Sequence, residues 1–265
     1  MAKLLWDQTS ERLYETGVDH AVLYPFNTTS KKYTPGVAWN GITGITESPS
    51  GAEATDLYAD NIKYLTLRSA ETYGYTVTAY TYPDEFANLD GTAEISTGIR
   101  IGQQARGTYG LSYRTISGND VSGNDYGNKL HLIYGSTASP SEKAYATVND
   151  SPEAIEFSWE CTTTPVDVPG FKPTASIVID CNSVDDTKLT TLENLLYGTD
   201  GVFTAFTGST FVTGTDYYEK TEAGIYVITE DTEPQSGKEY FTQTAPGTVA
   251  ELPLPKKIME IFAEG

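Results

Sequence analysis

The sequence is poor in the residues that most often build metal, disulfide and catalytic sites. It has two cysteines, two histidines and two methionines in 265 residues. Cys161 and Cys181 are too few for a disulfide framework or a four-ligand zinc site. His20 and His131 have no His or Cys neighbour at ligand spacing, and neither a Gly-x-Ser-x-Gly elbow nor a phosphate-binding loop is present. We therefore expect no metal, no cofactor and no enzymatic activity.

Basic residues and long apolar runs are also scarce. Seventeen Lys and Arg stand against 36 Asp and Glu, which gives a net charge of −19. Such a surface repels phosphate groups, so tight wrapping around nucleic acid is excluded. No run of about 18 apolar residues exists, which predicts no membrane-spanning helix and no secretion signal. We expect the protein to be made in the cytoplasm.

The abundant residues are those of strands and turns, with 24 Gly, 13 Pro and 19 Tyr. Apolar and polar residues alternate in several short runs, the pattern of half-buried strands. The runs lie at 18–24, 71–82, 109–117, 129–134, 143–148, 153–163 and 174–180. Cys161 falls in the inward phase of its run, which predicts a buried thiol. Turn signals between the runs predict an all-β fold, an antiparallel β-sandwich or β-barrel.

One helix is predicted, at about 183–197. Ser183 is a suitable N-cap, Asp185 and Asp186 favour the first turn, and Gly198 marks the end. Leucines recur at helical spacing and form one apolar stripe, which predicts packing against a sheet. These are Leu189, Leu192, Leu195 and Leu196.

The segment 202–250 differs in character from the rest. Residues 213–221 align with 236–244 at an offset of 23, and each copy has a Gly turn followed by an aromatic pair. Two copies are too few for a solenoid. The sequence predicts a small inserted surface β module between a main domain of 1–201 and its end at 251–265.

The segment 35–60 is long, and its apolar residues lie among small and polar ones. Loops of this length are usually functional or disordered. We expect an extended arm that becomes ordered on another subunit; the alternative is a wide hairpin folded onto its own sheet. The residues assigned to the arm are Trp39, Ile42, Ile45, Glu47, Pro49, Glu53, Leu57 and Tyr58.

This same segment carries a resemblance to a known family. Residues 39–54 read Trp-Asn-Gly-Ile-Thr-Gly-Ile-Thr-Glu-Ser-Pro-Ser-Gly-Ala-Glu-Ala, followed at 58–64 by Tyr-Ala-Asp-Asn-Ile-Lys-Tyr. The chain here resembles the major tail tube protein of long-tailed (siphovirus-type) bacteriophages and prophages of Gram-positive bacteria. Further similar blocks follow in order at 80–86, 110–115, 123–127, 129–135, 140–145, 151–159, 172–176, 196–201 and 252–255.

The resemblance implies a structural virion protein with a β-sandwich or β-barrel fold and one packed helix. It implies homohexameric rings that stack into a tube, through which double-stranded DNA leaves without specific binding. Other expected partners are the tape measure, terminator and distal tail proteins, and the expected location is the virion. Residues 202–250 depart from the family pattern, so we expect the module to decorate the outside of the tube.

Repeating a charge of −19 in every subunit requires cations to meet carboxylates across the interfaces. The candidates for this pairing are Lys31, Lys32, Lys63, Arg68, Arg100 and Arg106.

Other readings are a carbohydrate-binding β-sandwich at a surface, favoured by the tyrosines, and a glycosidase using paired carboxylates. Glu156 and Glu160 are about 13 Å apart along a strand, too far for glycoside hydrolysis. The doubled Ser-Gly-Asn-Asp at 117–125 is an ordinary turn sequence, with an ion site as the alternative.

Overall fold

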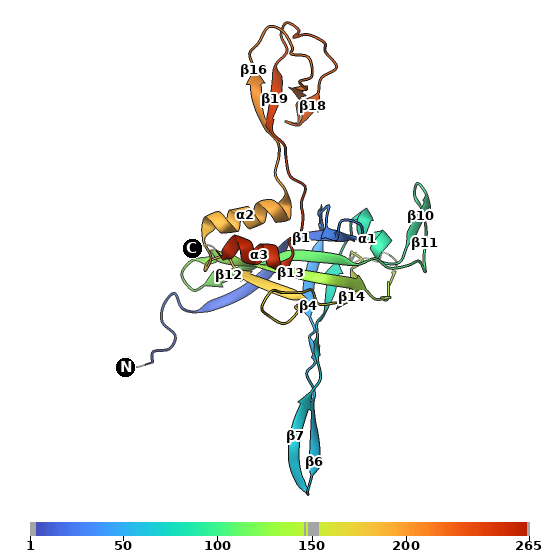
Figure 1. Cartoon of the computed structure of the whole chain (residues 1–265), viewed down its shortest axis with the longest axis vertical. Coiled ribbons are helices and arrows are strands. Elements are labelled where there is room, and N and C mark those ends of the chain that lie inside the picture. Colours follow the sequence, from blue (N-terminus) through green and yellow to red (C-terminus); the bar gives the residue numbers. More distant parts are fainter. Residues whose placement is uncertain (1–3, 146, 148–153, 264–265) are drawn as a thin grey trace.

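The computed structural model of the chain describes residues 4–145, 147 and 154–263. These residues fold mainly into antiparallel strands, which confirms the all-β expectation. Figure 1 shows a central β body with two projections on opposite sides. One projection is a long hairpin, and the other is the small sheet inserted near the C-terminus.

The central body is a curled sheet that closes on itself. Its path runs β1-β12-β13-β14-β9-β4, with β2 and β3 paired to β1 and with β15 paired to β13. The strand bounds are β1 (Leu13–Asn27), β2 (Lys32–Tyr33), β3 (Val37–Ala38), β4 (Ile42–Glu47), β9 (Gly74–Ala79), β12 (Tyr109–Asn119), β13 (Gly123–Ala138), β14 (Phe157–Thr163) and β15 (Ser176–Asp180).

Closure depends on residues 37–47, whose two short strands pair with opposite edges of the sheet. Ala38 of β3 lies opposite Val22 of β1, while Ile45 of β4 lies opposite Val77 of β9. This single segment therefore joins the first and last strands of the path, and the body is a β-barrel.

Aromatic side chains fill the barrel. Trp159 and Phe86 are fully buried, with ring centroids 5.1 Å apart, and Trp39 packs 4.4 Å from Phe86. The predicted inward phases are confirmed for Val77 and Cys161, which line the same core. The expected strand at 143–148 is wrong for its described residues, because 143–145 and 147 adopt no strand; 146 and 148 lie outside the described residues.

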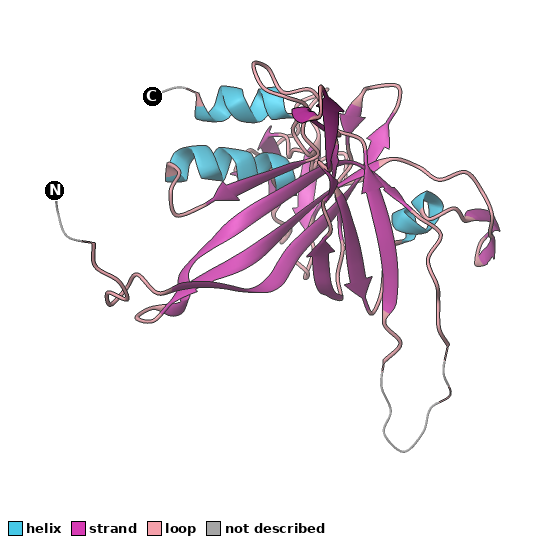
Figure 2. Ribbon diagram, turned by 90° about the horizontal axis from the view of Figure 1, so that it is seen from below, coloured by secondary structure: helices cyan, strands magenta, loops and turns pink. Residues whose placement is uncertain are grey.

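Two helices cover the outer face of the barrel (Figure 2). Helix α2 (Asp186–Tyr197) buries Leu192 and Leu196 against β13 and β15, so the leucine stripe packs on a sheet as expected. The helix begins later than predicted. Asp185, rather than Ser183, is the N-cap, because its carboxylate accepts hydrogen bonds from the amides of Thr187 and Lys188.

The expectation of a single helix is wrong, because the structure contains α1 (Asp84–Leu89) and α3 (Pro255–Phe262) as well. Helix α1 places Phe86 in the barrel. Helix α3 begins with Pro255 at its first position, where proline is favoured, and lies beside α2. Both helices are short, with six and eight residues, and fall below the length at which a sequence pattern separates a helix from a strand.

The inserted module is a separate sheet whose strands follow the order β16-β19-β17-β18. Their bounds are β16 (Val202–Phe206), β17 (Tyr217–Lys220), β18 (Tyr226–Ile228) and β19 (Tyr240–Ala245). The two connections to the barrel lie together, because Thr199 and Thr248 exchange backbone hydrogen bonds of 3.1 and 2.9 Å. Both ends of the module thus meet at one point on the body.

The 23-residue repeat is a structural repeat. Gly214 and Gly237 have φ of 85° and 86°. The hydroxyl of Tyr217 accepts a hydrogen bond from the amide of Val212 at 2.9 Å, and the hydroxyl of Tyr240 accepts one from the amide of Gln235 at 3.1 Å. The two copies therefore fold in the same way.

At the offset of 23, β16 corresponds to β18 and β17 corresponds to β19. The first copy thus holds β16 and β17, the second holds β18 and β19, and the two copies exchange their outer strands, β16 and β18. Phe203 of the first copy pairs with Gln243 of the second, and Tyr226 of the second pairs with Lys220 of the first, its equivalent at the same offset. The central strands β17 and β19 pair with each other, with Tyr218 opposite Phe241. The module is thus an intertwined pair of repeats with approximate two-fold symmetry.

Candidate assembly surfaces

The residues assigned to the arm divide between two structures. Trp39, Ile42, Ile45 and Glu47 belong to the barrel, where Trp39 is buried and its indole donates a hydrogen bond to the carbonyl oxygen of Thr81 at 2.9 Å. The expectation of an arm over 35–60 is therefore corrected. Its first part is the segment that closes the barrel, because β4 finds a free edge on β9.

The projecting hairpin begins after β4 and runs to β9, from 48 to 73. Pro49, Glu53, Leu57 and Tyr58 of the predicted arm lie in it. Its base is β5 (Ser50–Gly51) paired with β8 (Glu71–Thr72), and its tip is β6 (Ala54–Ala59) paired with β7 (Ile62–Arg68). Asp60 and Asn61 form the turn, with φ of 53° and 59° as in a type I′ hairpin. We call residues 48–73 the arm.

The two faces of the arm differ. Leu57 lies opposite Leu65, and Leu67 follows on the same face; their exposed fractions are 42%, 38% and 55%. On the other face, the carboxylate of Asp56 contacts Lys63 at 2.7 Å. Every residue of β6 and β7 is exposed. The apolar face of the arm thus has no partner within the described residues of its own chain.

At the base of the arm, polar residues close one end of the barrel. Tyr113 donates a hydrogen bond to Glu47 at 2.8 Å and stacks on His131 with ring centroids 4.6 Å apart. Burial lowers the pKa of His131 and raises that of Tyr113. These groups hold the end of β4 against β12 and β13, and so fix where the arm leaves the barrel.

Four of the six cations proposed for cross-subunit pairing have partners within their own chain. Lys32 contacts Glu251 at 2.9 Å, and Lys63 contacts Asp56. Arg100 contacts Asp84 at 3.0 Å, and Arg106 contacts Asp90 at 3.0 Å. These four already have acidic partners within their own chain, and their pairing across an interface stays a prediction. Lys31 and Arg68 have no ion pair among the described residues, so their pairing stays a prediction.

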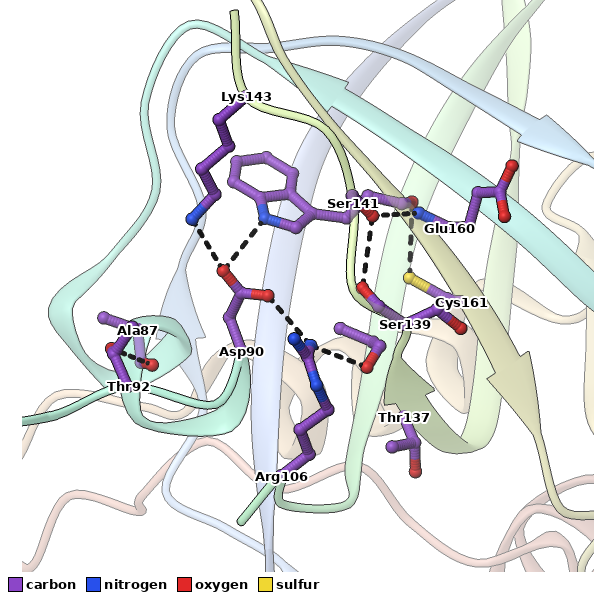
Figure 3. Close-up of polar contacts among 12 residues, drawn as sticks. Ala87, Asp90, Thr92, Arg106, Thr137, Ser139, Ser141, Lys143, Glu160 and Cys161 are labelled. Carbon is purple, nitrogen blue, oxygen red and sulfur yellow. Dashed lines mark hydrogen bonds and ion pairs between the residues drawn. The ribbon is translucent and has the colours of Figure 1, made fainter. Parts of the chain in front are cut away.

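Asp90 holds Arg106 within its own chain (Figure 3). This carboxylate is only 7% exposed and accepts hydrogen bonds from Arg106 at 3.0 Å, Lys143 at 2.8 Å and the Trp159 indole at 3.3 Å. Arg106 also donates to the carbonyl oxygen of Ala138 at 2.8 Å. A buried carboxylate needs such partners, so the cluster is part of the barrel.

An apolar groove of about 400 Å³ lies beside the start of α3. The groove is lined by residues of β1, of β2 and the turn before it, of the loop between β14 and β15, and of the start of α3, and these include two lysines and one aspartate. The lining residues are Phe26, Lys31, Tyr33, Val166, Asp167, Pro169, Leu254 and Lys256.

We next consider the groups of the described residues that could bind an ion or act as a nucleophile. Within residues 4–145, 147 and 154–263, no three His, Cys, Asp or Glu side chains gather to hold a metal ion. The doubled motif at 117–125 forms the turn between β12 and β13, in which the Asn119 side chain accepts hydrogen bonds from the amides of Val121 and Ser122. Burial raises the pKa of Cys161 to about 11, which disfavours the reactive thiolate.

The sequence was also compared with known proteins. No protein-family model matches the chain, and no curated protein matches its sequence. Across the part of the chain that the structure describes, no helix has both the length and the apolar character needed to cross a membrane.

Proposed function

We propose that this chain is the major tail tube subunit of a long-tailed bacteriophage or prophage. Six copies would form a ring, and the rings would stack into the conduit through which the phage DNA leaves the capsid. The proposal rests on the sequence resemblance and on one structural observation: an arm that leaves one end of a closed barrel with an unpartnered apolar face.

The arm supports assembly because a two-stranded hairpin is only marginally stable in water. Leu57, Leu65 and Leu67 gain stability only if another surface covers them. A contact between the arm at one end of a barrel and a different surface of the next copy is heterologous. Contacts of this kind repeat as open filaments or closed rings. The arm therefore favours a protein that functions as a polymer.

The charge of the chain fits a conduit for DNA. An acidic wall repels phosphates and lets the duplex slide, whereas lysines facing the bore would bind it at every ring. The same charge opposes assembly, and salt reduces this repulsion over distances beyond about 8 Å at physiological ionic strength. Tube formation should accordingly be weaker in low salt.

The test is negative-stain electron microscopy of the purified chain over a range of concentration and salt. Tubes of uniform width with a ring repeat support the proposal. A monodisperse monomer at high concentration and high salt contradicts it.

A second candidate is a carbohydrate-binding surface protein, favoured by one face of the inserted module. Four half-buried aromatic side chains gather there, and aromatic rings commonly supply apolar contact in ligand sites. They are Phe203, Tyr218, Tyr226 and Phe241. The rings of Phe203 and Tyr226 stack on each other at 4.0 Å, so they cover part of the surface that a sugar would need. Binding to purified cell-wall polysaccharide by a chain that stays monomeric would favour this candidate.

A further inference from the structure

We infer that His131 is a proton-sensing residue at the base of the arm, and that its protonation releases the end of β4 from β12 and β13. The arm then loses its fixed direction of exit from the barrel. This inference goes beyond the proposed function, because it concerns the base of the arm in a single chain and not the contacts between chains. It starts from the position of Glu47, which is the last residue of β4 and directly precedes the arm.

The imidazole of His131 is held on two sides by residues of β12. Its ring stacks on that of Tyr113, with centroids 4.6 Å apart and an interplanar angle of 6°. Its Nε2 atom shares a hydrogen bond of 3.0 Å with the hydroxyl of Thr115. Only 12% of the His131 side chain is exposed. The ring is therefore fixed between its neighbours with little access to water.

The other ring nitrogen has no partner in this arrangement. Nδ1 of His131 is buried and makes no hydrogen bond within the described residues. A carboxylate oxygen of Glu47 lies 3.7 Å away, beyond hydrogen-bond distance. That oxygen accepts a hydrogen bond of 2.8 Å from the hydroxyl of Tyr113. A ring protonated on both nitrogens needs an acceptor at Nδ1, and Glu47 supplies none in this position.

The charged groups around the ring oppose one another. Glu47 on β4 and Glu15 on β1 favour a protonated His131, whereas Lys129 on the same strand disfavours it. Lys129 and Glu15 contact each other, so their effects on the ring offset in part. The other neighbours are uncharged: they are Tyr113 of β12 and Tyr73 before β9, whose pKa values are raised by burial, and Val178, which lies opposite His131 on β15.

Burial is the largest of the influences on the ring, and it lowers the pKa of His131 below the usual 6.5. The closed cluster therefore favours the neutral ring, and the stabilisation from this preference is fully present above about pH 6.5. It is lost as the pH falls through the lowered value, because a buried imidazolium without an acceptor is costly. Acid thus favours an open base, in which water reaches the ring and Tyr113 no longer holds Glu47.

The end of β4 is the part of the cluster that can open. Its pairing with β9 ends at Glu47 opposite Tyr75, and one further hydrogen bond of 2.7 Å follows, from the amide of Ser48 to the carbonyl oxygen of Gly74. The side chain of Glu47 is 40% exposed, so water already reaches this side. Strand ends open at a lower free energy than a packed core. The opening therefore begins where the arm starts and leaves the core around Trp159 closed.

Amide hydrogen exchange of the full-length chain tests the release. The chain is measured at pH 7 and pH 5, below the concentration at which it polymerises, and the rates are corrected for the intrinsic effect of pH. The amides of 46–48 and 74–76 should exchange at least about threefold faster at pH 5, because opening follows protonation of the ring. Those of α2 take no part in the cluster and should not change. Equal protection of 46–48 at both pH values overturns the inference.

Substitution of each histidine assigns the effect to one ring. His131→Gln removes the titrating group, so its exchange should be the same at pH 7 and pH 5. His20→Gln is the matched control, because His20 is the other histidine of the chain and contacts Asp19 on β1. This control should keep the full pH response of the unmodified chain. A response that persists in His131→Gln, or that is lost in His20→Gln, overturns the inference.

Glu47→Gln tests the same site should circular dichroism show that His131→Gln is unfolded. The glutamine still accepts a hydrogen bond from Tyr113 but no longer attracts a protonated ring. The titration midpoint of His131, followed by NMR of the imidazole, should therefore move to lower pH. An unchanged or raised midpoint overturns the inference.

The outcomes separate this inference from the proposed function, because the release is measured in unpolymerised chain. If the base of the arm stays closed at pH 5 while the chain forms tubes, the inference fails and the tube proposal stands. If the base opens as expected but no condition yields tubes, the proposed function fails and the inference stands.

Discussion

The arm and the inserted module are each joined to the barrel by two adjacent stretches of chain, but they differ in whether their apolar side chains are buried. The module packs Tyr217 and Tyr240 among its own aromatic rings, and both are buried. Strands β6 and β7 of the arm bury no side chain, and their leucines remain exposed. A projection that buries its own apolar side chains is stable by itself. A projection that leaves them exposed needs another surface to cover them. This difference favours the arm, rather than the module, as the assembly surface of the proposed tube.

Removing each projection in turn tests this division most strongly. Replacing 50–72 with a short Gly linker should leave a folded barrel, because the amide of Ser48 donates to the carbonyl oxygen of Gly74 at 2.7 Å and holds the ends together. Polymer formation should be lost completely. Replacing 202–246 in the same way should leave thinner tubes. The measurements are thermal melting by circular dichroism and negative-stain microscopy; tubes from the armless chain would reverse the assignment.

Substitutions in the segment that closes the barrel and in the arm should differ greatly in their effect on the free energy of unfolding. Trp39→Ala should lower the free energy of unfolding by about 3–5 kcal/mol, because it empties a site in the barrel core. Tyr58→Ala on the exposed arm should change it by no more than about 0.5 kcal/mol. Denaturant unfolding measures both. A large loss of stability for Tyr58→Ala would mean that the arm packs on its own barrel in solution.

The two repeats of the module offer a finer comparison. Tyr217→Phe removes only a hydrogen bond from the amide of Val212 and should destabilise the module by about 1 kcal/mol. Tyr240→Phe also removes a hydrogen bond of 2.5 Å to the carboxylate of Asp231 and should destabilise it more. Amide hydrogen exchange of the module reports both effects. Equal effects would show that the hydrogen bond from Tyr240 to Asp231 contributes nothing.

Within the module, acid should produce the smallest effect, confined to one repeat. Hydrogen bonds from Lys238 and Tyr240 lower the pKa of Asp231 below its usual 3.8. A lowered folded-state pKa means that this stabilisation is complete above about pH 4 and is lost as the pH falls through the folded value. The amides of 231–240 should therefore exchange faster at pH 3 than at pH 5, once corrected for intrinsic rates. Those of 208–217 lack these contacts and should change less.

The sequence predicted the features that depend on local patterns. Alternation identified the buried face of β9 and β14, and Gly198 marked the end of α2. The duplicated Gly and aromatic positions identified the module and its repeat. These succeed because period-two burial, caps and turns are set by residues close together in the chain.

The sequence did not predict how the segment 35–60 divides between the barrel and the arm. Trp39 and Leu57 are both apolar residues among polar neighbours, yet one is buried and the other is exposed. The difference lies in strand pairing, because residues 37–47 pair with β1 and β9 of the barrel, whereas residues 54–59 pair only with β7. The internal partners of Arg100 and Arg106 were missed for the same reason, because each lies 16 residues from its aspartate and meets it only through the fold.

The exchange of outer strands restricts how the inserted module can change in size. A single 23-residue copy would hold an outer strand with no central strand to receive it and would have to borrow a partner from another molecule. Insertions of this type should therefore gain or lose copies in pairs. An odd number within one chain would leave an outer strand unpaired, which invites aggregation.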